Sequence, residues 1–103
     1  MSGFVLHPAA FRDIQEIWEF IAADNLDAAD RILDELRESI DKLVDFPEMG
    51  FRREELASNP LRFFSVRDFL ICYAPEEKPL LVVAVLHTGR NPRVLAAVLR
   101  QRK

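Results

Sequence analysis

The spacing of apolar residues changes once along this chain, and that change constrains the fold more than any single motif does. Over residues 9–45 they return every three or four positions, whereas over residues 61–86 they alternate with polar residues or run without a break. The first spacing is typical of amphipathic helices and the second of strands. The chain therefore predicts an α+β domain with helices first and a sheet after them, in which two helices cover one face of the sheet.

Two helices are predicted in the first half of the chain. Pro8 suits a first helical position, because its ring fixes φ and its missing N–H is not needed there, and the helix continues over residues 9–23. After a short break Asn25 caps a second helix, which ends near Asp45. So short a break makes the two helices an antiparallel hairpin.

Three strands joined by tight turns are predicted in the second half, at residues 61–67, 69–74 and 80–86. Together they form an antiparallel meander, and the last is almost wholly apolar, as expected for a central strand that is buried on both faces. A short apolar strand at residues 3–7 is expected to join them in an antiparallel sheet. Asn91 and Pro92 begin a last helix over residues 93–100.

The composition fits a single domain over residues 1–103, because half of the residues are apolar and a chain of this length can bury its own core. The one cysteine, Cys72, cannot form a disulfide within the chain and lies in an apolar run, which indicates a buried thiol in a reducing compartment. No stretch approaches the roughly 20 apolar residues that span a bilayer, and the N-terminus lacks the pattern of a secretion signal. We expect a cytoplasmic protein with no membrane contact.

The charges are divided unevenly between the two halves. Residues 1–50 carry four Lys and Arg against twelve Asp and Glu, a net charge of −8, whereas residues 51–103 carry ten against five, a net charge of +5. Proteins that bind nucleic acid usually carry a basic excess that neutralises phosphates. The overall charge of −3 therefore argues against docking on ribosomal RNA, and only the second half offers a basic surface.

Several short motifs occur in a fixed order along the predicted elements. They are His7-Pro8-Ala9-Ala10 and Asp13-Ile14 at the first helix, Phe46-Pro47-Glu48-Met49-Gly50 after the second, Leu61-Arg62 entering the sheet, Ile71-Cys72-Tyr73 on the next strand and Val85-Leu86-His87-Thr88-Gly89-Arg90 closing the last. Together with the order of elements, this set resembles the ParE/RelE superfamily of toxins from bacterial toxin–antitoxin pairs, over nearly the whole chain. One departure is His7, which stands where the family usually has a hydroxyl residue before the helix.

The resemblance implies one of two functions. RelE-like members cut messenger RNA on the ribosome, whereas ParE-like members bind DNA gyrase, trap it on cleaved DNA and block replication, and an antitoxin holds both kinds inactive. The favoured expectation is a ParE-like toxin without catalysis, associated with plasmid stabilisation and neutralised by a ParD-like antitoxin. Such a toxin contacts DNA only indirectly, through gyrase or the antitoxin complex. A member that has lost its toxicity and only binds its antitoxin is a further alternative.

A ribonuclease site would need a base for the 2′-hydroxyl, cations for the phosphate and an acid for the leaving oxygen. If the chain is a ribonuclease, the candidates are Arg62, Tyr73, His87 and Arg90. Tyr73 lies in an apolar strand, where a packed ring with a hydrogen-bonded tip is the simpler interpretation. His87 stands alone at a strand end, and such a histidine usually has a structural role, donating to a carbonyl or a carboxylate. The ParE-like expectation includes no catalytic residue and no cofactor. We expect no metal site, because His7, His87 and Cys72 fall on separate strands without ligand spacing.

Two binding surfaces follow from the resemblance and the charge pattern. The candidates for target binding are Arg62, Arg90, Arg93, Arg100 and Arg102. Those for antitoxin binding are Phe11, Trp18, Phe20, Asp30 and Asp34. Family position implies that Arg62 lies near Arg90 on the sheet, and we expect the last helix, with Lys103 after it, to be an element that the core does not need. Phe20 lies off the apolar stripe of its helix, so we expect it to be exposed to a partner.

Overall fold

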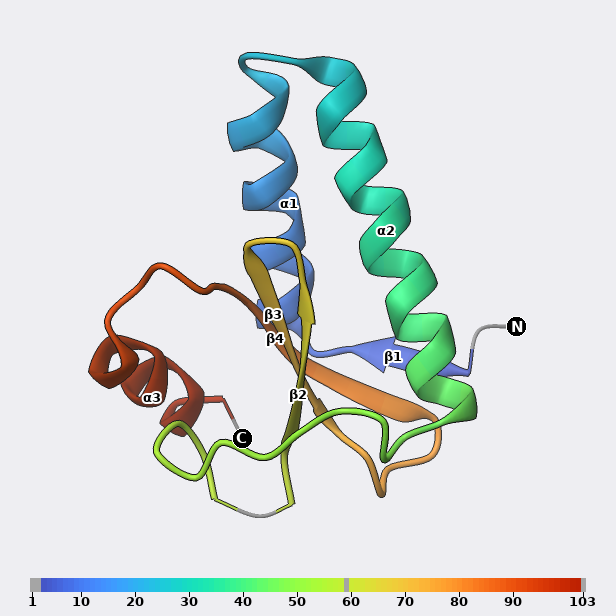
Figure 1. The fold of residues 1–103 in the computed structure, drawn as a ribbon, viewed down its shortest axis with the longest axis vertical. Helices are drawn as coiled ribbons and strands as arrows, with labels where there is room; N and C mark the ends of the chain where they lie inside the picture. The colour runs from blue at the N-terminus through green and yellow to red at the C-terminus, as the bar shows by residue number, and fades with distance from the viewer. Residues whose placement is uncertain (1–2, 59, 103) are drawn as a thin grey trace.

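The computed structural model describes residues 3–58 and 60–102 and confirms the predicted order of helices and strands (Figure 1). The elements are β1 (Phe4–Leu6), α1 (Pro8–Ala22), α2 (Leu26–Asp45), β2 (Arg62–Val66), β3 (Phe69–Ala74), β4 (Leu80–His87) and α3 (Pro92–Arg100). His7 caps α1 although it lacks a hydroxyl, because its Nδ1 accepts a 3.0 Å hydrogen bond from the N–H of Ala9. Asn25 caps α2 as predicted, since its side chain accepts from the N–H of Ala28.

The four strands form one sheet in the order β1, β4, β3, β2, and the sheet is mixed rather than wholly antiparallel. β2, β3 and β4 form the predicted antiparallel meander, but β1 pairs with β4 in parallel, with Leu6 opposite Val82. The prediction of an antiparallel β1 is wrong. The two helices of the hairpin run in opposite directions, so they return the chain to the end of the sheet where β1 begins, and β2 runs in the same direction as β1. The chain then reverses twice in the meander, so β4 also runs in that direction. The predicted central place of β4, between β1 and β3, is confirmed.

The helical hairpin covers one face of the sheet. Leu36 and Leu43 of α2 are buried in one cluster with strand residues such as Ile71 and Val82. Figure 1 shows that the closed end of the hairpin, where α1 turns into α2, projects beyond the sheet. Side chains on the inner side of that projection therefore have no sheet beneath them, and Phe20 is 79% exposed, as expected from its place off the stripe.

The other face of the sheet carries a second core. Leu95 and Leu99 of α3 are buried there together with Leu56, Phe63 and Cys72, and every residue of β3 is buried. The expectation that the core does not need the last helix is wrong, because without α3 this apolar face would meet water. The buried position predicted for the single thiol is confirmed. None of the described helices is long and apolar enough to cross a membrane.

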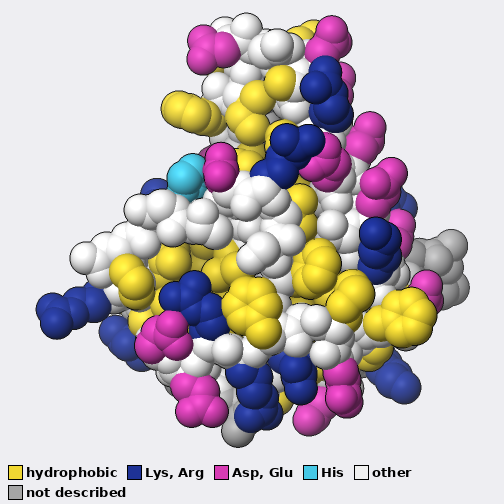
Figure 2. Space-filling view, in the orientation of Figure 1, with side chains coloured by type: hydrophobic (Ala, Val, Ile, Leu, Met, Phe, Trp, Pro, Cys, Tyr) yellow, Lys and Arg dark blue, Asp and Glu magenta, His cyan; other side chains and the backbone are white. Residues whose placement is uncertain are grey.

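The surface repeats the uneven charge of the sequence (Figure 2). Acidic side chains follow the outer side of α2, whereas apolar side chains gather below the hairpin, over β2 and the segment that precedes it. Phe46, Met49 and Phe51 of that segment are exposed. Phe51 also forms an isolated antiparallel bridge with Phe63 on the outer side of β2, since its N–H and C=O bond to Phe63 at 2.8 and 2.7 Å.

Candidate functional site: a groove beside the end of β4

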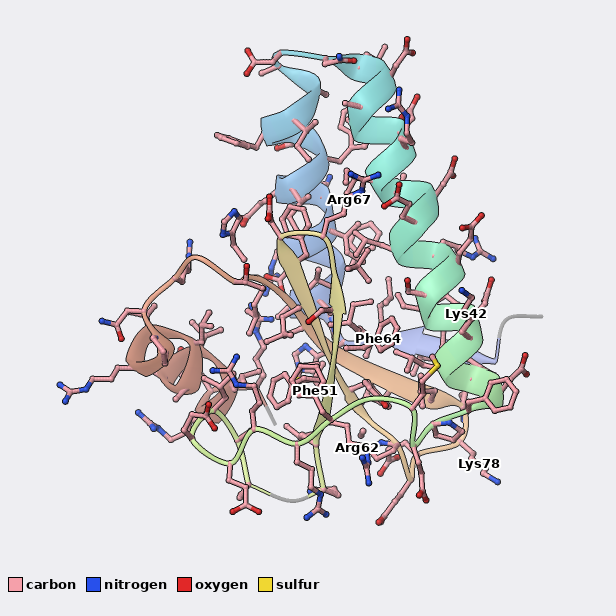
Figure 3. The ribbon with its side chains drawn as sticks, in the orientation of Figure 1. Lys42, Phe51, Arg62, Phe64, Arg67 and Lys78 are labelled. Carbon is pink, nitrogen blue, oxygen red and sulfur yellow. The ribbon has the colours of Figure 1, made fainter. Side chains whose placement is uncertain are left out.

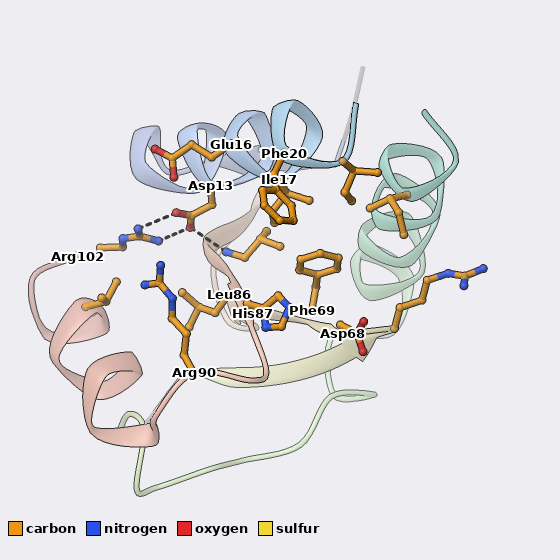
Figure 4. Close-up of a pocket in the computed structure, with 15 residues that line it drawn as sticks. Asp13, Glu16, Ile17, Phe20, Asp68, Phe69, Leu86, His87, Arg90 and Arg102 are labelled. Carbon is orange, nitrogen blue, oxygen red and sulfur yellow. Dashed lines mark hydrogen bonds and ion pairs between the residues drawn. The ribbon is translucent and has the colours of Figure 1, made fainter. Parts of the chain in front are cut away.

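A groove of about 610 Å³ opens between the projecting hairpin, the turn that joins β2 to β3, the end of β4 and the C-terminal segment (Figure 4). Ile17 and Phe20 of α1 line one side, and Phe69 and Leu86 line the sheet side. The groove exists because the hairpin is longer than the sheet that it covers. An open apolar groove with a few charged residues is typical of a site that binds a ligand or a partner.

One side of the groove is fastened by an ion pair between Asp13 of α1 and Arg102, which follows α3 (Figure 4). Arg102 Nη2 donates to Asp13 Oδ1 at 2.9 Å, Arg102 Nη1 donates to Oδ2, and the two side chains are only 15% and 14% exposed. Asp13 Oδ2 also accepts a 3.0 Å hydrogen bond from the backbone N–H of Val85, and Arg102 Nη1 reaches the carbonyl of Val83 at 3.4 Å. The pair therefore ties α1, β4 and the C-terminal segment together.

His87 and Arg90 line the groove where β4 ends. The imidazole Nδ1 of His87 accepts a 3.0 Å hydrogen bond from the N–H of Gly89, and the ring meets Phe69 edge-on with centroids 5.5 Å apart. These contacts support a structural role for the histidine, although Nδ1 accepts a bond from the turn, where we had expected the ring to donate one. Arg90 is exposed, and no ion pair involves it among the described residues. The groove thus contains a cation beside apolar surface.

Arg67, in the turn between β2 and β3, also lines the groove, but unlike Arg90 it is paired with a carboxylate. Its guanidinium makes two hydrogen bonds to the carboxylate of Glu35 on α2, one of them 2.8 Å between Nη2 and Oε2. The hydrogen bond from Arg67 is the main cause that holds the pKa of Glu35 below its ordinary value. This ion pair joins the helical hairpin to the turn between β2 and β3. The guanidinium of Arg67 is therefore already paired within the chain.

The sequence matches a family model over residues 4–92, which is most of the chain and includes the groove residues of α1 and β4. The family is described as the ParE toxin of the type II toxin–antitoxin system, parDE. The chain belongs to the ParE toxin family. The resemblance inferred from the ordered motifs is thereby confirmed, although the match ends at Pro92, so the rest of α3 lies outside the segment that identifies the family. No curated protein matches the sequence.

In this ParE family member, Tyr73 and Arg62 lie at the other end of the sheet from the groove. The ring of Tyr73 is buried, and its hydroxyl donates to the carbonyl of Pro47 at 2.6 Å and accepts from the N–H of Gly50 at 2.9 Å. Burial is the main cause of the raised pKa of Tyr73. Arg62 Nη1 donates to the carbonyl of Gly50 at 2.8 Å (Figure 3). The packed ring with a hydrogen-bonded tip is confirmed, and these contacts anchor the segment after α2.

The strand register separates this pair of residues from His87 and Arg90. Arg62 is opposite Tyr73, and Tyr73 is opposite Val82, five residues before His87 in β4. At about 3.3 Å per residue, His87 lies roughly 16 Å further along the sheet. The prediction that Arg62 lies near Arg90 is wrong, because Arg62 begins β2 at the end of the sheet where β4 begins, whereas Arg90 follows the end of β4.

The predicted antitoxin-binding residues divide between two sides of the hairpin. Phe11 and Phe20 are nine residues apart in α1, which at about 3.6 residues per turn places them on opposite flanks. Trp18 is on the flank that faces α2, where its indole N–H donates to Asp30 Oδ1 at 3.0 Å. Phe20 lines the groove, Phe11 is 57% exposed on the other flank, and Asp34 is exposed on α2. The five residues therefore do not form one surface.

The predicted target-binding residues are divided as well. Arg93 and Arg100 are exposed on α3, whereas Arg102 is held by Asp13, and Lys103 lies outside the described residues. We did not predict the role of Asp13, although its place gave a signal: it follows Ala10 by three residues and precedes Ile17 by four, so a carboxylate occupies a position of the apolar stripe. The described part of the chain contains no group of three or more His, Cys, Asp and Glu that could hold a metal ion.

Proposed function

We propose that this ParE family member is a toxin that acts by binding: it traps DNA gyrase on cleaved DNA, and a ParD-like antitoxin encoded beside it neutralises it. In this proposal the toxin has no catalysis of its own. Membership of the family supports the toxin–antitoxin role. The observation that carries the choice of binding over catalysis is that the four residues an RNA-cutting site would need stand in two groups at opposite ends of the sheet.

Neither group by itself is arranged to cleave RNA. A general acid or base needs an atom that can exchange a proton within hydrogen-bond reach of the substrate. The hydroxyl of Tyr73 donates its proton to the carbonyl of Pro47 and accepts from the N–H of Gly50, so that proton is already engaged within the fold. Burial raises the pKa of this hydroxyl. His87 has one ring nitrogen engaged by its own turn and its ring packed edge-on against Phe69. Of the arginines that line the groove with it, only Arg90 is free of a carboxylate partner among the described residues, so one cation would have to hold the phosphate.

The two binding roles fall to different surfaces in this proposal. The groove, with exposed Phe20 on its helical side, receives the antitoxin. Gyrase is contacted by the exposed cations Arg93 and Arg100 on α3, whereas Arg90, which lines the groove, falls on the antitoxin side. DNA is touched only indirectly, through gyrase or through the antitoxin complex. The toxin would act in the cytoplasm and would need no cofactor.

The proposal is tested with the purified chain, freed from any antitoxin, in two parallel assays. One measures whether gyrase accumulates cleaved DNA, and the other measures whether messenger RNA is cut on translating ribosomes. We expect cleaved DNA and intact messages. Cut messages with unaffected gyrase would replace this proposal with a RelE-like ribonuclease, and no effect in either assay would favour a chain that only binds its antitoxin.

A further inference from the structure

β4 has an outer edge that β1 covers over only part of its length. The parallel pairing ends at Val82, whose carbonyl then accepts from the N–H of His7 at 2.8 Å, and the chain leaves the sheet as α1. Alternate residues of a strand turn their N–H and C=O groups to the same neighbour. Since the N–H of Val85 points away from β3 to a side chain, the N–H of His87, two residues on, points to that outer side as well. The register of β3 and β4 shifts at Val83, and this irregularity lets the adjacent carbonyls of Val82 and Val83 both face the outer side.

Side chains already satisfy the first half of this uncovered edge. The N–H of Val85 donates to Asp13 and the carbonyl of Val83 accepts from Arg102, so the ion pair supplies one acceptor and one donor, as a neighbouring strand would. The carbonyl of Val85 and the N–H of His87 continue the edge into the groove, which both residues line. Within the described residues no strand pairs with β4 at this point. Such an edge is a template for another extended chain.

The residues beside this edge define the side chains that an occupant needs. Ile17, Phe20 and Phe69 surround an apolar recess. Arg90 has no ion pair among the described residues, whereas the two other arginines that line the groove are each bound to a carboxylate. A carboxylate of the occupant would therefore pair with Arg90. Glu16 of α1 lines the same groove, so a uniformly acidic segment does not fit.

We propose that an extended segment of the antitoxin occupies this groove and adds a short strand to the outer edge of β4, bonding to the carbonyl of Val85 and the N–H of His87. The segment carries an apolar residue for the recess and an acidic residue for Arg90. This inference rests on the antitoxin partnership proposed above. The added strand ends at the ion pair of Asp13 and Arg102, which fills the next positions of the edge.

A helix alone would match this surface less well. A helix bonds its own N–H and C=O groups to one another, so it would cover the carbonyl of Val85 and the N–H of His87 without bonding to either. Buried polar groups left without a partner oppose binding. An extended segment supplies a donor and an acceptor at strand spacing and still turns alternate side chains to the recess.

The first test follows the backbone atoms that the added strand would use. The affinity of the full-length toxin for the purified antitoxin encoded beside it is measured by calorimetry, and amide hydrogen exchange of the toxin is then followed by NMR with and without the antitoxin. Exchange at the amide of His87 is expected to slow about tenfold or more in the complex. The amide of Ser65, an exposed residue on edge strand β2, is the control and is expected to keep its rate.

The second test addresses the side chains. Arg90→Glu is expected to weaken antitoxin binding about tenfold or more, because it places like charges together in the groove. Arg52→Glu makes the same change of charge on an exposed residue that does not line the groove, and we expect it to leave the affinity unchanged. In Phe20→Cys the introduced thiol is exposed and Cys72 is buried, so a thiol reagent reports on the groove. The antitoxin is expected to slow that labelling about tenfold or more.

Each outcome decides between the two levels of the proposal. Tight binding with unchanged exchange at His87 would overturn the added strand and leave the antitoxin partnership standing. Unchanged affinity of Arg90→Glu would overturn the acidic contact. Absence of any binding by the wild-type toxin would remove the partnership itself, and the added strand with it.

Discussion

Asp13 on α1 and Arg102 after α3 are 89 residues apart in the chain, and they form a two-point ion pair that holds both ends of the fold against β4. Both side chains are largely buried, so each charge depends on the other in place of water. Asp13 also accepts from the N–H of Val85, which β1 does not reach. The pair is therefore a structural link as well as one side of the groove.

Asp13→Ala is expected to lower the free energy of unfolding by about 3 kcal/mol, because it leaves the guanidinium of Arg102 buried without a carboxylate. It also leaves the N–H of Val85 without an acceptor. Arg102→Ala is expected to have a similar effect, and the double variant should lose less than the sum of the two single variants. Urea denaturation followed by circular dichroism measures all three changes.

The exposed pair of Glu35 and Arg67 is the control for this prediction. It has a comparable two-point geometry, but water screens its charges, so Glu35→Ala is expected to have a much smaller effect on unfolding. If Glu35→Ala and Asp13→Ala lower the free energy of unfolding equally, burial is not what makes the pair of Asp13 and Arg102 important for stability.

Tyr73→Phe is expected to lower the free energy of unfolding by about 2 kcal/mol, because it leaves the carbonyl of Pro47 and the N–H of Gly50 without their partner. Amide exchange at Gly50 should become faster, since the hydroxyl holds that segment against the sheet. Toxicity should persist wherever the variant is folded. A stable, fully folded variant without toxicity would instead point to a catalytic role for the hydroxyl.

Cys72 makes stability depend on alkaline pH. Burial raises the pKa of its thiol from 9.0 to about 12. The unfolded chain loses this proton as the pH passes 9.0, whereas the folded chain keeps it. The contribution of the thiol to the free energy of unfolding is therefore fully present below pH 9.0 and is lost as the pH rises towards about 12. Tyr73 adds to the same trend at higher pH, since burial raises its pKa too.

Thermal unfolding from about pH 8 to about pH 10.5 measures this dependence. The melting temperature of the wild type is expected to fall over the alkaline part of the range, and that of Cys72→Ala is expected to fall less steeply, whatever its value at neutral pH. Parallel curves for the two proteins would show that the buried thiol is not the cause.

The helices could be predicted because each depends on local features, such as apolar spacing and the cap formed by Asn25. The direction of β1 could not, since a strand of three residues has the same apolar spacing beside a parallel or an antiparallel neighbour. The role of α3 in the second core was missed for a related reason. Leu95 and Leu99 form an apolar face in the sequence, but which sheet face they cover is decided by contacts with distant residues such as Leu56.

The groove depends on the length of the hairpin relative to the sheet, which no single segment of the sequence reveals. The exposure of Phe20 could be predicted, because the residue lies off the stripe of its own helix. The pairing of Asp13 could not, because its partner is near the other end of the chain. The proximity of Arg62 and Arg90 was inferred from family position, and the register of β2 and β4 puts the two residues at different ends of the sheet.

The C-terminal helix has a buried face and an exposed cationic face, and two variants separate their roles. Leu99 is 4% exposed in the second core, so Leu99→Ala is expected to lower the free energy of unfolding by about 3 kcal/mol. Arg93 and Arg100 are exposed, and replacing both with Ala is expected to change stability by less than about 0.5 kcal/mol. The double replacement should nevertheless reduce the accumulation of gyrase-cleaved DNA, because it removes the proposed contact.

Truncating the chain after Leu95 would not separate a loss of stability from a loss of gyrase contact, because the shortened chain also lacks buried Leu99 and the partner of Asp13. The control for the double arginine variant is replacement of Lys42 and Lys78 by Ala, which removes two exposed cations far from α3 (Figure 3). This control is expected to retain both stability and gyrase poisoning. If the arginine variant is folded and still poisons gyrase as well as the control does, the contact with gyrase lies on another surface.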